Sequence, residues 1–178
     1  MWYNQKKSAV PEEDTVALSV EKLVRVDDGM LDIMTEWMYL WWGENEGHSR
    51  EEIRCYMEHG IQQDRLPQTY GMFLDGTLIG MYQFRLDDLF ARPDLYPWLA
   101  NVYLDPAYRS RGYGTVLMES ILRNARDRLP FRELFLYTTH TELYERYGWE
   151  FVSEIDTFLE HNRVQRLYRL DLQRDEMT

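Results

Sequence analysis

Residues 109–114 read Arg-Ser-Arg-Gly-Tyr-Gly, and this stretch lies between an apolar run, 98–104, and a segment with helical periodicity, 113–128. Glycine has no Cβ and tolerates positive φ, so the backbone of such a turn can approach a ligand closely and aim successive N–H groups at it. The following helix adds its unpaired N-terminal donors and the positive end of its dipole, while Arg109 and Arg111 add formal charge. The stretch therefore predicts a turn that binds a polyanion.

The segments on both sides of this turn predict a strand, a helix and a second strand. The apolar run 98–104 is the first strand, and residues 134–138 are the second. The helix over 113–128 ends before Pro130, and its predicted buried face consists of Val116, Leu117, Ile121, Leu122 and Ala125. A strand, helix and strand in such close succession are typical of a βαβ crossover, so the two strands should be parallel.

The N-terminal part of the chain predicts a strand, two helices and a hairpin. Aliphatic and β-branched residues over 15–24 favour a strand, and apolar residues at spacings of three and four over 30–42 predict a helix that Gly43 ends. Ser49 and Glu52 form a capping box for a second helix, which stops before Pro67. Asp75-Gly76 suits a two-residue hairpin, with strands at 69–74 and 77–84.

The C-terminal part predicts a short helix and a strand pair. Thr139 and Glu142 have the spacing of a second capping box, and the helix that follows carries Leu143, Tyr144 and Tyr147. Gly148 closes this helix. The final strands are predicted at 149–158 and 164–170.

Length and composition indicate one folded domain. The chain has 178 residues, of which 44% are hydrophobic and 29% charged, as in an ordered globular protein. We expect an N-terminal extension at 1–14 and a single domain at 15–178. No apolar stretch is long enough to span a membrane and no signal-peptide core follows the start, so the expected location is the cytoplasm.

Charge and cysteine content exclude several classes of function. The formal net charge of −11 repels nucleic acid and anionic membranes, so neither is an expected partner. The single cysteine, Cys55, excludes an internal disulfide framework and a multi-cysteine metal site. We expect Cys55 to be a small buried apolar residue, and we expect no metal.

Two motifs in order carry a resemblance to a known family. The turn at 109–114 is not a P-loop, because no Gly-Lys-Ser/Thr follows, and it is not a dinucleotide fingerprint, because Leu117 stands in place of the third glycine. It matches Arg/Gln-x-x-Gly-x-Gly/Ala, is preceded by Leu104-Asp105-Pro106, and is followed by Leu-Tyr-Glu-Arg-Tyr-Gly-Trp at 143–149. On these motifs the chain resembles the GCN5-related N-acetyltransferase (GNAT) superfamily over about residues 15–171.

The resemblance implies the fold and the reaction. The fold is mixed α/β, a GNAT-like acyl-CoA N-acyltransferase fold with a central, mostly antiparallel twisted sheet, a parallel splayed strand pair and flanking helices. The reaction is transfer of an acetyl group from acetyl-CoA to a primary amine. Direct attack in a ternary complex is expected because no cysteine or serine stands in an activated arrangement. A protein N-terminal or lysine acetyltransferase, and a non-catalytic acyl-CoA-binding sensor, are the alternatives. A homodimer is a further option.

The resemblance also implies roles for particular residues. Tyr144 takes the place of the general acid that protonates the departing coenzyme A thiolate. Family members often carry an asparagine a turn or two before this tyrosine; residues 137–140 stand there in this chain, and its contact could pass to Thr139 or His140. The residues implied to bind acetyl-CoA are Val102, Tyr103, Leu104, Arg109, Ser110, Arg111, Gly112, Tyr113, Gly114, Thr115 and Thr139.

The general base and the acceptor stay open at this level. Asp87, Asp88, Glu44, Glu46 and His140 are candidates for the base, and each can equally be a solvated surface group or a structural residue. The aromatic run 37–42 has helical spacing and so predicts core packing, yet aromatic faces beside carboxylates also suit a cation. A small cationic amine is therefore the hypothesis for the acceptor.

Overall fold

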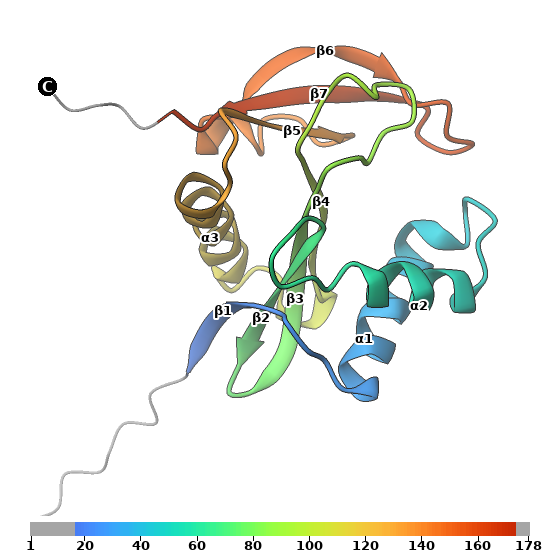
Figure 1. The fold of residues 1–178 in the computed structure, drawn as a ribbon, viewed down its shortest axis with the longest axis vertical. Coiled ribbons are helices and arrows are strands. Elements are labelled where there is room, and N and C mark those ends of the chain that lie inside the picture. Colours follow the sequence, from blue (N-terminus) through green and yellow to red (C-terminus); the bar gives the residue numbers. More distant parts are fainter. Residues whose placement is uncertain (1–16, 174–178) are drawn as a thin grey trace, which may run out of the picture.

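The computed structural model describes residues 17–173, so the predicted extension at 1–14 lies outside the described residues. The described strands form one sheet in the order β1-β2-β3-β4-β5-β7-β6 (Figure 1). Neighbouring strands are antiparallel except β4 and β5, which are parallel as predicted. The strands are β1 Leu18–Lys22, β2 Gln68–Leu74, β3 Thr77–Arg85, β4 Trp98–Leu104, β5 Glu133–Thr138, β6 Glu150–Asp156 and β7 Val164–Asp171. The predicted mixed sheet with one parallel pair is confirmed.

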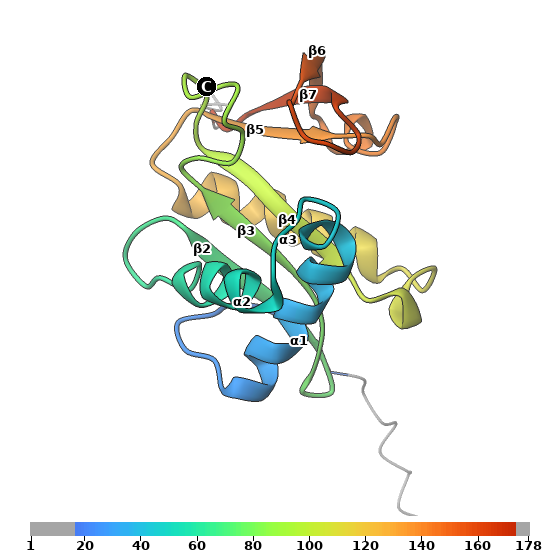
Figure 2. The ribbon, with the colours of Figure 1, turned by 90° about the vertical axis from the view of Figure 1, so that its right-hand side faces the viewer.

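Helices cover both faces of the sheet. The pair α1 (Asp28–Met38) and α2 (Arg50–His59) packs on one face, and α3 (Tyr113–Arg128) packs on the other (Figures 1 and 2). Each face has its own core, and we call them the α1–α2 core and the α3 core. The first contains Met34, Met38, Ile53 and Met57, and the second contains Leu117, Ile121, Leu134 and Leu136.

The first helix starts earlier than its apolar spacing predicts. The side chain of Asp27 accepts the N–H of Met30 at 2.8 Å and so caps the helix. The last turn, Tyr39–Gly43 (η1), is π-helical. Gly43 ends the helical run as predicted, and a Cβ there would lie 2.8 Å from Ile53 Cδ1. The two N-terminal helices therefore approach closely because this residue is glycine.

Two short-range predictions are confirmed by their hydrogen bonds and angles. Ser49 caps α2 in a full capping box, with Ser49 Oγ accepting from Glu52 N at 3.2 Å and Glu52 Oε2 accepting from Ser49 N at 2.7 Å. The hairpin between β2 and β3 turns at Asp75 and Gly76, whose φ angles are 48° and 78°. Both signals are local, so they need no tertiary context to form.

The strand–helix–strand unit has the predicted bounds at β4 and α3, with one error on the helix face. Leu117, Ile121 and Ala125 are buried as predicted, but 36% of the Val116 side chain is exposed. Val116 lies in the first turn of α3, next to the exposed Gly114 and Thr115. Leu117 is the first buried residue that α3 contributes to the α3 core.

The predicted short helix near the C-terminus is wrong. Residues Glu145–Tyr147 (η3) form only a single 3₁₀ turn, and no side chain caps it. Gly148 still ends the turn in the left-handed conformation, with φ of 83°. Tyr144 precedes the turn and is buried against Trp149 and Tyr168. Burial of this aromatic side chain, rather than helical hydrogen bonding, fixes the segment.

Cys55 is exposed, so the prediction that it is buried is wrong. It lies on the outer side of α2, with its Sγ 3.6 Å from His59 Nδ1 one turn later. The buried residues of α2 are Ile53 and Met57, and Cys55 falls between them in sequence on the opposite side of the helix.

Candidate active site

The two halves of the sheet meet at β4 and β5 and are joined only at one end. Trp98 pairs with Phe135 in parallel register, and the Phe135 N–H donates to the Pro97 carbonyl at 3.0 Å. Beyond this point no register pair joins these strands within residues 17–173. The backbone of Val102–Leu104 therefore has no strand partner on its β5 side. Apart from the Leu104 carbonyl, which accepts a bond from Arg109 Nε, the N–H and C=O groups that point toward β5 are available to a ligand.

A β-bulge in β4 lies at the start of this opening. The register between β3 and β4 shifts between Met81 and Gln83. Asn101, opposite the shift, has φ of 53°, a left-handed conformation that asparagine tolerates better than most residues. A bulge bends its strand and re-aims the side chains around it. Asn101 thus marks the place where β4 changes course beside β5.

The turn after β4 presents an uncapped helix N-terminus. Gly112 is the N-cap of α3 with φ of 86°, and no side chain bonds to the first turn. A Cβ built on Gly112 or Gly114 would meet no atom within 4 Å, so space is open in front of the backbone. Ser110 also has positive φ, at 62°, and Thr115 is exposed in the first turn. Exposed N–H groups at the positive end of a 16-residue helix form an anion-binding site.

The two arginines of the turn differ in their contacts. The Arg109 Nε donates to the Leu104 carbonyl at 2.8 Å, and its guanidinium lies 5.6 Å from the Tyr103 ring centroid. Arg109 is therefore folded back onto the end of β4. Arg111 is exposed, and Tyr113 packs against the α3 core. The structure brings the residues of 109–115 and 102–104 together around the end of one strand.

Tyr144 is a buried phenol on the α3 side of the sheet. Its side chain is 7% exposed and packs in the α3 core, to which Val102 and Leu104 also contribute. Burial raises the pKa of Tyr144 to about 12. The phenol therefore keeps its proton at neutral pH. Trp149, whose ring centroid lies 5.9 Å from that of Tyr144, has a buried Nε1 without a hydrogen-bond partner among the described residues.

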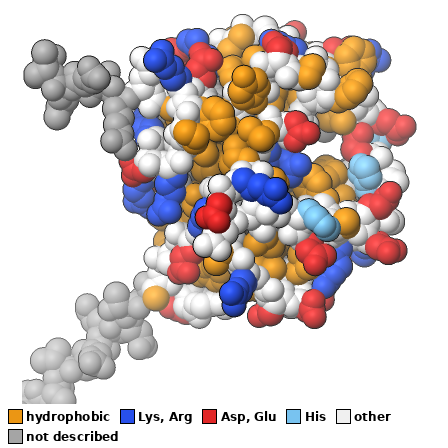
Figure 3. Space-filling model, viewed as in Figure 1, with side chains coloured by type: hydrophobic (Ala, Val, Ile, Leu, Met, Phe, Trp, Pro, Cys, Tyr) orange, Lys and Arg blue, Asp and Glu red, His pale blue; other side chains and the backbone are white. Residues whose placement is uncertain are grey.

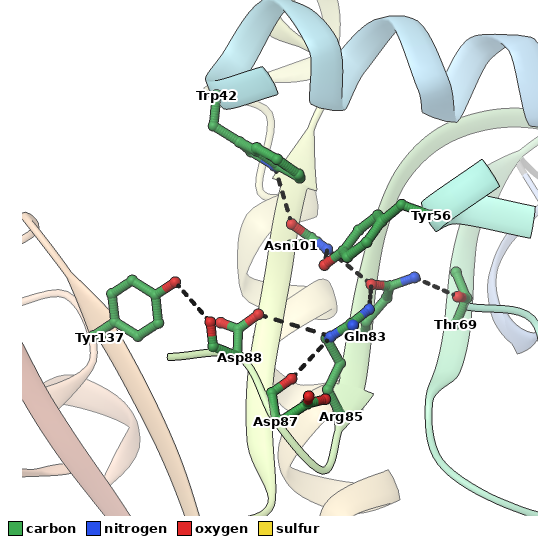
Figure 4. Close-up of polar contacts among 9 residues, drawn as sticks. All are labelled: Trp42, Tyr56, Thr69, Gln83, Arg85, Asp87, Asp88, Asn101 and Tyr137. Carbon is green, nitrogen blue, oxygen red and sulfur yellow. Dashed lines mark hydrogen bonds and ion pairs between the residues drawn. The ribbon is translucent and has the colours of Figure 1, made fainter. Parts of the chain in front are cut away.

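A polar network lies on the opposite face of the sheet, between β4 and the helices α1 and α2 (Figure 4). Asn101 is its centre: its Oδ1 accepts from Trp42 Nε1 at 3.2 Å, and its Nδ2 donates to Tyr56 OH at 2.9 Å and to Gln83 Oε1 at 2.8 Å. Gln83 in turn donates to Thr69 Oγ1 at 2.8 Å. The bulge is thereby held from both N-terminal helices and from β3.

Arg85 and Asp88 continue this network toward β5. Arg85 Nη1 donates to Gln83 Oε1 at 3.4 Å, its guanidinium lies 4.4 Å over the Tyr56 ring, and its Nε is 3.8 Å from Asp88 Oδ1. Tyr137 of β5 donates its OH to the Asp88 carbonyl at 3.4 Å. Burial raises the pKa of Asp88 to about 6, although Arg85 acts in the opposite direction.

The other candidates from the sequence lie in more open positions. Asp87, Glu44, Thr139 and His140 are exposed. Glu46 is half-buried, and its Oε2 accepts the Glu160 N–H of the β6–β7 loop at 3.4 Å. Of the five candidate bases, the structure encloses Asp88 most fully, with 16% of its side chain exposed.

Two open hollows of ≈500 and ≈380 Å³ share Leu95, Glu133 and Phe135, and both lie by the other end of β5, away from the network of Asn101. Within residues 17–173 no group of three or more His, Cys, Asp or Glu could hold a metal ion. No helix of that region has the length and apolar character required to cross a bilayer.

Sequence reasoning did not identify the centre of the network. Asn101 is a polar residue inside an otherwise apolar strand, and Gln83 is another, so both carried a signal that could have been used. Tyr56 lies on α2, and a helical position alone does not tell a packing tyrosine from one whose hydroxyl has a partner. Arg85 and Tyr137 become neighbours of Asp88 only through the tertiary fold.

A sheet opened at a parallel strand pair, with an uncapped helix start at the end of one strand, defines the acyl-CoA N-acyltransferase class of fold. The sequence model of the family described as Acetyltransferase (GNAT) family matches residues 31–149. The chain belongs to this family.

Solved structures with the same fold differ in what they act on. A spermidine N-acetyltransferase from Vibrio cholerae in complex with CoA and spermine has a TM-score of 0.66 and 14% identity, covering 87% of this chain and 95% of its own. An acetyl transferase from Salmonella typhimurium that modifies the N-terminal serine of 50S ribosomal subunit protein L7/L12 has a TM-score of 0.65 and 12% identity, covering 90% and 97%.

An N-acetylglutamate synthase from Neisseria gonorrhoeae, complexed with coenzyme A and N-acetyl-glutamate, has a TM-score of 0.60 and 20% identity. The match covers 89% of this chain and 36% of that one, so this chain spans about a third of its length. A comparison with curated proteins finds no match. At these identities the likeness shows the fold alone.

Proposed function

We propose that this protein transfers an acetyl group from acetyl-CoA to a primary amine of a small cationic molecule. One observation carries the proposal: the opening between β4 and β5 and the uncapped start of α3 lie at the same end of β4. An extended thioester arm can hydrogen-bond to the free edge of Val102–Leu104 while its pyrophosphate meets the N–H groups of the turn. Two of the related structures contain CoA, which supports this choice of donor.

The turn fits a pyrophosphate by its backbone rather than by its side chains. Open space before Gly112 and Gly114 lets phosphate oxygens reach the N–H groups of the first helical turn. Arg111 is exposed and can add charge, whereas Arg109 braces the end of β4 through the Leu104 carbonyl. In this proposal Ser110, Tyr113 and Thr115 line the same turn, and Thr139 follows β5 on the other side of the opening.

Tyr144 suits the role of general acid. Its pKa, raised by burial to about 12, keeps the phenol protonated until a thiolate forms beside it. It lies in the α3 core with Val102 and Leu104. Cys55 is exposed on α2 beside His59, outside the opening, so direct attack by the amine fits better than a covalent relay.

The chemistry of the α1–α2 side supports a cationic acceptor. Acidic and histidine side chains gather along the right-hand edge of the molecule, over the helices α1 and α2 (Figure 3). Trp41 is 47% exposed there, and its ring lies 5.7 Å from that of Tyr103 at the end of β4. Aromatic faces and carboxylates attract an alkylammonium group. The spermidine N-acetyltransferase with the same fold offers a precedent for such an acceptor.

The proposal is tested by thiol release from acetyl-CoA across a panel of acceptors. The panel contains spermidine, spermine, glutamate and a peptide with an N-terminal serine. We expect release with the polyamines, confirmed by the mass of the acetylated product, and none above background with glutamate. Release with the peptide alone would favour the protein acetyltransferase. Acetyl-CoA binding without release for any acceptor would favour the sensor.

A further inference from the structure

Asp88 lies where the two halves of the sheet meet, between β3 and β5. It follows β3, is held by Tyr137 from β5, and lies 3.8 Å from the guanidinium of Arg85 (Figure 4). The halves of the sheet are otherwise separated beyond the pairing of Trp98 with Phe135. A carboxylate in this place lies beside the opening in which the thioester is proposed to bind, on the α1–α2 face.

The surroundings of Asp88 differ from those of an exposed ion pair. Its side chain and that of Arg85 are 16% and 15% exposed. The Tyr137 hydroxyl bonds to the Asp88 carbonyl, and Arg85 lies over the ring of Tyr56. The network from Arg85 through Gln83 reaches Asn101 at the bulge of β4. Asp88 is thus connected to the strand that would present the thioester.

Among Asp88 and the titratable side chains around it, Asp88 is the group that can gain or lose a proton near neutral pH. Burial raises its pKa to about 6, Arg85 and the Tyr137 hydroxyl lower it, and Asp87 raises it. Burial raises the pKa of Tyr56 to about 12, and that of Tyr137 is raised as well. At neutral pH both phenols are protonated and Arg85 is charged. Asp88 is then mostly an anion able to accept a proton.

We propose that Asp88 is the general base that takes the proton from the acceptor's ammonium group; this inference rests on the proposed function. The N–H bond breaks, its electron pair stays on nitrogen, and the proton goes to a carboxylate oxygen of Asp88. The lone pair then forms the C–N bond at the thioester carbon. The C–S bond breaks with its electron pair on sulfur, and Tyr144 supplies the proton that completes the thiol.

The remaining protons balance through solvent. The nitrogen loses its second proton to water as the amide forms, Tyr144 regains one from water, and Asp88 releases the proton it accepted. One proton is set free for each acetyl group transferred. Arg85 is a positioning residue in this scheme, because its charge lowers the pKa of Asp88 and so favours the ionised carboxylate near neutral pH.

The test compares the wild-type protein with Asp88→Asn across pH. The acceptors are the panel amine with the highest kcat/KM and hydroxylamine, which is already uncharged at neutral pH. We expect wild-type kcat/KM to rise with an apparent pKa of about 6. In Asp88→Asn this rise with pH, the acidic limb, should disappear. Its kcat should fall by about 10²-fold with the charged amine, and by far less with hydroxylamine. Coenzyme A affinity, measured by calorimetry, should stay within a few-fold.

Two further variants sharpen the result. Asp87→Asn removes the same charge one residue away from an exposed side chain and should retain the acidic limb. Arg85→Gln should move the limb to higher pH, because the Arg85 charge lowers the pKa of Asp88. The second variant tests the base even where Asp88→Asn fails to fold.

The outcomes separate this inference from the proposed function. A wild-type protein that binds acetyl-CoA and acetylates neither the panel amines nor hydroxylamine overturns both. An active wild-type protein whose acidic limb survives in Asp88→Asn, with equal losses for the charged and uncharged acceptors, overturns the role of Asp88 alone. An acidic limb that stays in place in Arg85→Gln counts against it in the same way.

Discussion

At the scale of single residues, Tyr144 combines burial with a hydroxyl that has no hydrogen-bond partner within residues 17–173. Its side chain is 7% exposed, and its pKa is raised by burial alone, with no hydrogen bond contributing. A phenol that only filled the core could be replaced by phenylalanine without consequence for chemistry. A phenol that protonates a thiolate could not, because the departing sulfur would then leave as an anion in an apolar site.

We therefore expect Tyr144→Phe to lower kcat by about 10²-fold while the affinity for coenzyme A is retained. Steady-state rates with the best acceptor of the panel and calorimetric titration with coenzyme A measure the two quantities. Tyr147→Phe is the matched control, since Tyr147 packs against the same core from the same turn. If both variants kept the wild-type kcat throughout the pH range, Tyr144 would be a packing residue.

Residue identities also show where sequence reasoning reached its limit. The positive φ at Asn101 and its three side-chain hydrogen bonds depend on Trp42, Tyr56 and Gln83, which are distant in sequence. Cys55 was misplaced because small apolar residue types favour the interior only on average. Its position on the helix, between Ile53 and Met57, was the better guide.

At the scale of elements, the start of α3 is the part of the site that depends least on side chains. Gly112 takes φ of 86° and Gly76 in the β2–β3 hairpin takes 78°, and a Cβ at either position meets no atom within 4 Å. An aspartate at either position carries the same kind of backbone strain, about 1–2 kcal/mol for a left-handed φ. Only at Gly112 would its carboxylate occupy the proposed pyrophosphate position.

We expect Gly112→Asp to abolish measurable coenzyme A binding while the protein stays folded. Gly76→Asp should cost similar stability and leave binding intact. Calorimetric titration and circular dichroism of the two variants decide the matter; retained affinity in Gly112→Asp would place the anion elsewhere.

The helices and strands that were predicted correctly are those whose sequence patterns are short and local. The bounds of β4 and α3, the capping box of α2 and the Asp75-Gly76 turn follow from short patterns that their own backbones complete. The short helix predicted after Thr139 does not form, because the segment has the spacing of a capping box but too few residues to propagate a helix. The start of α1 at Asp28 was missed since the Asp27 cap precedes the apolar pattern.

At the scale of the whole molecule, the buried carboxylate of Asp88 links stability to pH. Its folded pKa of about 6 lies above the 3.8 of an ordinary aspartate. A group with a raised folded pKa contributes stability that is present below its unfolded pKa and is lost as pH rises through its folded pKa. Asp88 therefore disfavours the folded state above about pH 6, where it is charged.

We expect Asp88→Asn to raise the thermal midpoint by a few degrees at pH 7.5, with a difference that shrinks toward pH 4. Calorimetry across this range measures it. Asp94→Asn is the control of opposite sign, because the bond from Arg92 lowers the pKa of Asp94. If Asp88→Asn were destabilised equally at pH 7.5 and at pH 4, the Asp88 side chain would stabilise the fold, and the carboxylate would not lower the stability of the folded protein.

The opening between β4 and β5 has a consequence for how this protein is handled. Backbone groups of an unpaired strand edge can pair with the same edge of another molecule, which is a common beginning of aggregation. Here the edge is left open between β4 and β5, and the ligand that fits it would also cover it. Preparations kept with coenzyme A should therefore stay clear on storage at concentrations where ligand-free preparations become turbid.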